Sequence, residues 1–196
     1  LNLPITPIND LRVHQNNLIA ATSGRSFWVL DDLALIRQHK NETGLKLYQP
    51  QSQIIVNGYS EMDINSPTGV NPFRGVNPAT GAVIYYELPE LKAKEHITLN
   101  IKDAQGNLVR SFTSVKDSTQ KQYDGAPPAD PVLAKSKGLN RFVWNLRYPT
   151  MTGVPNVYIE SSYRGHKASP GKYSITLKAG DKTATAEFEL LPNPLY

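Results

Sequence analysis

The 196-residue chain is long enough for one large domain, or for a smaller domain with an attached subdomain. Hydrophobic residues make up 39% and charged residues 19%, as in folded globular proteins, and no apolar run approaches the roughly 20 residues of a membrane-spanning helix. The net charge of +4 comes without a dense basic run that carries interleaved aromatic residues, which disfavours a nucleic-acid partner. The absence of cysteine excludes disulfides, thiolate metal sites and a cysteine nucleophile.

Residues 1–50 predict a meander of short antiparallel strands. Asn16-Asn17 and Ser23-Gly24 are turn signals between alternating apolar runs. One or two helical turns are expected over 33–39, with Asp31 or Asp32 as the N-cap. The strand candidates of this region are 11–14, 17–22, 26–30 and 45–48.

Residues 51–80 predict an irregular connector that lies along a surface. The dipeptides Asn57-Gly58, Asn71-Pro72 and Asn77-Pro78 are turn signals, and few apolar residues separate them. Only 54–56 has the composition of a short, locally paired strand.

Residues 81–196 predict an all-β antiparallel sandwich of the immunoglobulin/fibronectin-like class, centred on Trp144. Alternation places Ile97, Leu99 and Ile101 on one face of their strand, and Phe142, Trp144 and Leu146 on one face of another. Parallel pairing is disfavoured because no helices are available as crossovers. The strand candidates are 82–88, 96–101, 108–112, 139–146, 173–178 and 183–190, and the polar segment 114–137 is expected to be loosely packed.

Two groups of motifs resemble parts of one kind of bacterial protein. The strings Asp10-Leu11-Arg12-Val13-His14 and Arg25-Ser26-Phe27-Trp28-Val29-Leu30-Asp31-Asp32 resemble the last blade of sortilin-like or BNR-repeat propellers, which are often labelled glycosyl hydrolases. The strings Asn140-Arg141-Phe142-Val143-Trp144-Asn145-Leu146-Arg147-Tyr148-Pro149 and Pro170-Gly171-Lys172-Tyr173 are similar to the immunoglobulin/fibronectin-like domain that follows such propellers. The repeated Ser-x-Asp-x-Gly-x-Thr-Trp box of sialidase-type propellers is absent.

The resemblance implies the C-terminal part of an exported, extracytoplasmic protein, periplasmic or secreted. The chain begins at Leu1 without a signal peptide, which suggests a cut end. The implied partners are upstream propeller domains of the same chain. Because only about one blade is present, catalytic carboxylates of a parent propeller would lie upstream, and no cofactor is expected.

No single residue is a strong candidate for catalysis or metal binding. Asp31 and Asp32 are adjacent in sequence and are poorly placed for a glycosidase, which needs two carboxylates facing each other across roughly 5–10 Å. The four histidines lie far apart, which disfavours a zinc site. Trp144 is interpreted as a core residue, and so is Trp28, although one of the adjacent Phe27 and Trp28 must face outward.

The leading expectation is therefore a non-catalytic structural or accessory module. One alternative is a carbohydrate-binding module, whose aromatic face would use Tyr85, Tyr86 and Tyr148, with Tyr158 and Tyr163 beside them; alternation buries one of Tyr85 and Tyr86. The other alternative is a fragment that contributes Arg25 or Asp32 to a hydrolase site formed by upstream blades. Trp28 and Arg25 are also possible ligand or interface residues. Unpaired sheet edges in 1–50 would allow packing against the sandwich or formation of a homodimer.

Overall fold

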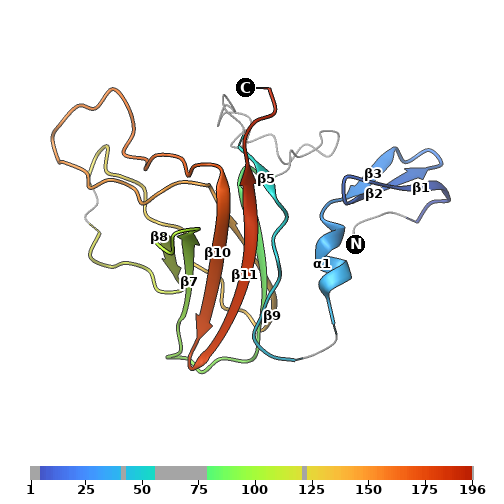
Figure 1. Cartoon of the computed structure of the whole chain (residues 1–196), viewed down its shortest axis with the longest axis horizontal. Coiled ribbons are helices and arrows are strands. Elements are labelled where there is room, and N and C mark those ends of the chain that lie inside the picture. The colour runs from blue at the N-terminus through green and yellow to red at the C-terminus, as the bar shows by residue number, and fades with distance from the viewer. Residues whose placement is uncertain (1–4, 41–42, 56–78, 121–122, 196) are drawn as a thin grey trace. The chain divides into compact units, whose positions relative to one another are not determined.

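The computed structural model describes residues 5–40, 43–55, 79–120 and 123–195. The chain divides into two compact units, Leu1–Glu42 and Thr43–Tyr196 (Figure 1). Strands dominate both units, and the only helix among the described residues spans six residues. The all-β class predicted from the sequence is confirmed. The expected connector lies mostly outside the described residues. No helix in the described part of the chain is long and apolar enough to cross a membrane.

The first unit is the predicted meander. Its sheet has the order β1-β2-β3, built from β1 (Ile8–His14), β2 (Asn17–Thr22) and β3 (Phe27–Leu30), and both pairings are antiparallel. Gln15 and Asn16 have φ of 44° and 66° at the tight turn between β1 and β2. Positive φ at both central residues is the geometry that lets a two-residue turn follow the twist of its strands, and Asn adopts it readily.

The same turn also fixes the helix α1 (Leu33–Gln38). Asp32 occupies the N-cap position as predicted, but it has φ of 60° and its side chain makes no capping hydrogen bond. Instead, the Leu33 amide donates to the Asn16 carbonyl at 2.8 Å, and the Asp32 amide donates to Asn17 Oδ1 at 3.1 Å. The β1–β2 hairpin thus accepts the hydrogen bonds of the free amides at the start of α1, a role that the sequence predicted for an aspartate side chain.

The second unit is a sandwich of two sheets. The larger sheet has the order β5-β11-β10-β7-β8, seen side by side in Figure 1, and the smaller has the order β4-β6-β9. The strands are β4 (Lys46–Leu47), β5 (Gln53–Ile54), β6 (Ala82–Leu88), β7 (Ile97–Asp103), β8 (Leu108–Thr113), β9 (Gly138–Trp144), β10 (Gly171–Ala179) and β11 (Lys182–Leu191). The long strands agree with the predicted ones to within two residues at nearly every end.

The short strands β4 and β5 change the predicted boundaries. β4 pairs antiparallel with β6, and β5 pairs parallel with β11 through Leu190 opposite Gln53. The sandwich unit therefore begins at Thr43, whereas the sequence assigned 43–50 to the meander and started the sandwich near 81. The parallel pairing of β5 with β11 also differs from the sequence prediction, which disfavours parallel strands. The pairing occurs because the chain between β5 and β11 is long enough to return without a crossover helix.

Alternation along the strands builds the core. Ile97, Leu99 and Ile101 of β7 are fully buried, as predicted. Across the sandwich, the Trp144 ring meets the rings of Tyr173 and Phe188 with centroids 5.7 and 6.2 Å apart, both edge-on. These contacts join the two sheets, because Trp144 lies on β9 and its partners lie on β10 and β11. Edge-to-face packing is a preferred geometry of aromatic pairs.

We expect Trp144→Ala to lower the free energy of unfolding of the sandwich by about 3–5 kcal/mol, because the large cavity left between the sheets is lined by rigid rings. The change is measured by urea denaturation of the full chain. Leu139→Ala is the matched control on the same strand: its side chain is 51% exposed, and we expect a loss of about 0.5 kcal/mol or less. Equal losses for the two variants would contradict this assignment of the core.

Candidate functional site

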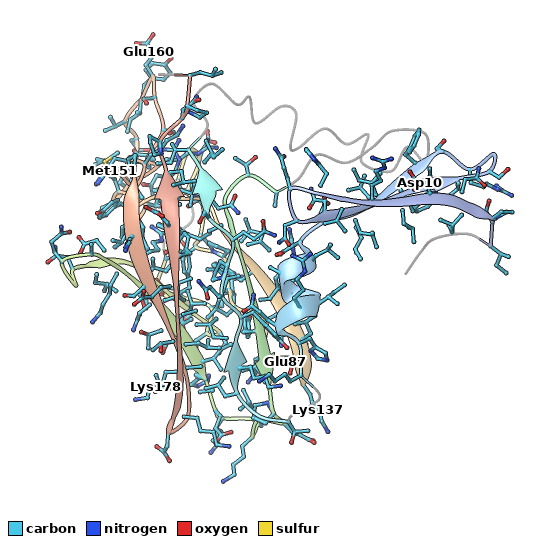
Figure 2. All side chains as sticks on the ribbon, turned by 45° about the vertical axis from the view of Figure 1, so that its right-hand side comes forward. Asp10, Glu87, Lys137, Met151, Glu160 and Lys178 are labelled. Atoms are coloured by element: carbon cyan, nitrogen blue, oxygen red, sulfur yellow. The ribbon has the colours of Figure 1, made fainter. Side chains whose placement is uncertain are left out.

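A groove of about 790 Å³ opens at one end of the sandwich. Its walls are the end of β8, the polar segment 114–137 that follows it, and a long arm over 147–167 that connects β9 to β10. Figure 2 shows Met151, which lines the groove, and Glu160 on this arm, at the end of the sandwich away from Lys137 and Lys178. Because the groove lies at one end of the sandwich, it does not interrupt the packed core between the sheets.

The arm is held by main-chain bonds across its base. The Tyr148 amide donates to the His166 carbonyl at 3.0 Å, and the Met151 amide donates to the Tyr163 carbonyl at 2.7 Å. Gly165 is buried, and a Cβ there would lie against the Tyr148 and Pro149 carbonyls. Only glycine therefore allows the two sides of the arm to approach so closely.

The groove is lined by both polar and apolar side chains, and Asp117 is hydrogen-bonded to a neighbour within its own segment. Asp117 Oδ1 accepts hydrogen bonds from the Thr119 amide at 2.8 Å and from the Thr119 hydroxyl at 2.6 Å. The hydroxyl bond is the main cause that lowers the Asp117 carboxyl pKa below its usual range. Asp117 is therefore ionised near neutral pH and suits the role of an acceptor, not of a general acid, which needs a raised pKa.

Arg110 is a buried cation beside the groove. Residue pairing between β7 and β8 shifts at Val109, so both Val109 and Arg110 are buried at this β-bulge. The Arg110 guanidinium forms an ion pair with Asp130, which lines the groove, and lies 5.1 Å from the centre of the Phe112 ring. Its Nε and Nη1 atoms are buried without a hydrogen-bond partner in the described part of the chain. Asp130 is thus the only described counter-ion of a charge removed from water.

The segment 130–136, which we call the strap, crosses from β8 to β9 through a series of specific contacts. Leu133 is buried and its amide donates to the Thr113 carbonyl at 3.0 Å. The Tyr86 hydroxyl donates to the Ala134 carbonyl at 2.6 Å. Buried Asn140 binds both the carbonyl and the amide of Ser136. The prediction of loose packing over 114–137 is wrong for the strap, because a buried anchor and a buried ion pair hold it.

Tyr123 contributes a second unsatisfied polar group. Its hydroxyl is buried without a partner among the described residues, and it lines the groove. Burial is the main cause that raises the Tyr123 pKa, so the phenol stays neutral near neutral pH. A Cβ on Gly153 would overlap Tyr123 and Pro127, so the arm packs directly on the polar segment here.

The structure separates the predicted tyrosines. Tyr86 is fully buried in the core, so it is excluded from a ligand-binding face, and burial raises its pKa to about 12. Tyr85 lies half-buried on the outer face of the smaller sheet, opposite Arg141. Tyr148 is half-buried on the arm and stacks on His166 with centroids 4.0 Å apart. Tyr85 and Tyr86 point to opposite faces of β6, and Tyr148 lies on the arm, so the three do not form one flat aromatic surface.

The two candidates in the meander lie together. Trp28 is half-buried, and its Nε1 donates to the Arg25 carbonyl at 2.8 Å, while the neighbouring Phe27 is 75% exposed. One of the two adjacent aromatic residues thus faces outward, as alternation predicts. Arg25 is exposed in the turn between β2 and β3. Within the described ranges, no three His, Asp or Glu side chains gather as metal ligands would.

No family model matches this chain, and no curated protein matches it. The resemblance to the C-terminal part of sortilin-like or BNR-repeat propeller proteins accordingly stays a prediction from motifs.

Sequence reasoning missed Arg110, Asp130 and Asn140, which are central to this end of the sandwich. Arg110 lies two residues before Phe112, but the bulge at Val109 interrupts the alternation of β8, so no periodic signal marks Arg110 as buried. Asp130 and Asn140 carry no such signal either, because their partners are distant in sequence or belong to an irregular segment.

We expect Asp130→Ala to destabilise the sandwich by about 2 kcal/mol, because it leaves the Arg110 charge buried and uncompensated. Arg110→Met should cost less, because the Asp130 side chain left behind is 52% exposed and remains hydrated. Chemical denaturation of both variants measures this asymmetry. An Asp130→Ala variant as stable as the natural protein would show that the ion pair contributes little.

Proposed function

We propose that the chain is a non-catalytic accessory module of an exported propeller protein, in which the sandwich is a rigid support and the meander packs by its side chains against a preceding domain. The observation that carries this proposal is an apolar face on the meander. Two rows of cross-strand neighbours share that face, because paired residues in a sheet point the same way. The rows are Leu11-Ala20-Trp28 and Val13-Leu18-Leu30.

This apolar face is incompletely covered. Leu11 and Val13 are 58% and 57% exposed, and Ala20 is the only buried hydrophobic residue of the described meander. A three-stranded sheet with one mainly apolar face gains stability by burying that face against another layer. The opposite face is mixed, with Arg12 beside Ile19 and Val29. The asymmetry supports packing through the Leu11 face.

The buried polar residues of the sandwich support a structural role for that unit. Arg110 and Asn140 are its only described buried polar residues, and both bind the polar segment that closes the sandwich. The Arg110–Asp130 ion pair and the hydrogen bonds between Asn140 and Ser136 thus help to fix the fold, while Nε and Nη1 of Arg110 have no hydrogen-bond partner among the described residues. A binding site built for catalysis uses buried polar groups to contact a substrate instead.

The double variant Leu11→Thr with Val13→Thr tests the apolar face in the full chain. We expect the natural protein to bind the dye ANS and to self-associate with increasing concentration, and the double variant to do both less, because the exposed apolar area is smaller. Fluorescence and sedimentation velocity measure these changes. Arg12→Thr, on the other face of the same strand, is the matched control. A natural protein that stays monomeric and binds no ANS would refute this role of the face.

Carbohydrate binding at the groove is a second candidate, favoured by one observation. The groove combines the buried Tyr123 hydroxyl, which no described residue binds, with hydroxyl side chains that include Thr150 and Thr152. Neutral sugars are recognised by hydroxyl and amide groups beside apolar surface. Affinity electrophoresis on a panel of neutral polysaccharides tests it: retardation is expected, and Thr152→Val should reduce it. Unchanged mobility on every gel would exclude this candidate.

A further inference from the structure

Among the described strands of the sandwich, four lie at sheet edges, and β9 differs from the other three. β4 and β5 are each two residues long. β8 is interrupted by the bulge at Val109 and is flanked by the strap, whose Leu133 amide binds the Thr113 carbonyl. Short strands, bulges and covering loops are the usual protections of sheet edges. β9 has seven residues, pairs with β6 along its whole length and has no strand on its other side among the described residues.

The hydrogen-bond pattern shows which main-chain groups of β9 are free. The Tyr48 amide donates to the Tyr85 carbonyl, so the main-chain groups of Tyr85 face β4. Successive strand residues alternate in direction, and Tyr86 therefore faces β9. Its partner is Asn140, whose main-chain groups face β6. By the same alternation, the N–H and C=O groups of Leu139, Arg141 and Val143 point to the open side.

No described residue binds the main-chain N–H or C=O of Leu139, Arg141 or Val143. The side chains of these residues occupy the outer face of the smaller sheet. Leu139 is 51% exposed, Arg141 is exposed, and Val143 is half-buried next to Val83. Arg141 has no ion-pair partner among the described residues; its cross-strand neighbour is Tyr85.

We propose that the open edge of β9 binds an extended segment of another protein, which adds to the smaller sheet as a fourth strand. These six main-chain groups, which no described residue binds, match a polypeptide backbone, since strand addition gains affinity from main-chain hydrogen bonds. Specificity comes from the side-chain row Leu139-Arg141-Val143: a matching segment has a carboxylate opposite Arg141 and apolar residues two positions to either side. A second copy of β9 is a poorer partner, because pairing centred on Arg141 places two arginines opposite each other.

The test uses the full, nitrogen-15-labelled chain and the capped peptide acetyl-Ser-Val-Thr-Glu-Thr-Val-Ser-amide. This sequence reads the same in both directions, so its Val-Glu-Val face matches the row in either strand orientation. We expect slowed amide hydrogen exchange at Leu139, Arg141 and Val143, and no change at Asn140 and Phe142, whose amides already face β6. This alternation distinguishes strand addition from contact through side chains.

Charge reversal at the exposed residue Arg141 provides a control that leaves strand β9 intact. Arg141→Glu should weaken binding of the Glu peptide by about fivefold and strengthen binding of a peptide with Lys in that position by a similar factor. No change at the three amides at millimolar peptide, or equal binding of both peptides by both proteins, would overturn the proposal. So would a natural protein whose three amides are already protected in a dimer. None of these results depends on the apolar face of the meander.

Discussion

The contact of Trp144 with Tyr173 and Phe188 is the constraint on which the sandwich depends. It joins the central strand pair of the larger sheet to the edge strand of the smaller one, so it fixes both the separation and the alignment of the sheets. The same indole donates from Nε1 to the Arg147 carbonyl at 3.0 Å, just after β9 ends. Leu146, between them, has φ of 57° and is still buried. One side chain therefore sets the core and also the point where the arm leaves it.

Long elements could be predicted because their burial follows the period of the strand. β6 alternates buried and half-buried residues from Ala82 to Leu88. The sequence predicts from alternation that one of Tyr85 and Tyr86 is buried, and the structure shows that it is Tyr86. β4 and β5 could not be found as parts of the sandwich, because two residues carry no period. The bulge at Val109 also leaves no periodic signal, so the burial of Arg110 together with its neighbour needed the structure. The Arg110–Asp130 pair likewise joins a strand to an irregular segment, and no spacing rule connects the two residues.

The edge strands β8 and β9 differ in how far other residues protect them. At β8, a bulge, a buried ion pair and the anchored Leu133 together protect the edge. The ion pair has a cost, since two nitrogens of the buried Arg110 guanidinium have no partner in the described part of the chain, which is unfavourable unless the structure gains elsewhere. Protection of the β8 edge is one such gain, because an open strand invites unwanted pairing. None of these protections is found at β9 among the described residues, and this contrast with β8 is the reason to propose a partner for the β9 edge.

The two proposed surfaces also differ in the forces that would act on them. The meander presents Leu11, Val13 and their neighbours, whose association would be driven by apolar burial and would be insensitive to sequence detail. The β9 edge presents main-chain donors and acceptors with a single charge, Arg141, so its binding would be directional, selective for a carboxylate and weakened by salt. The meander face would bind a neighbour by burying exposed apolar side chains, and the β9 edge would bind one through main-chain hydrogen bonds. The first kind of contact suits a fixed neighbour, and the second suits a partner that can be exchanged. If both proposed surfaces bind as described, the chain would combine a permanent attachment with a selective edge, as the proposed accessory role requires.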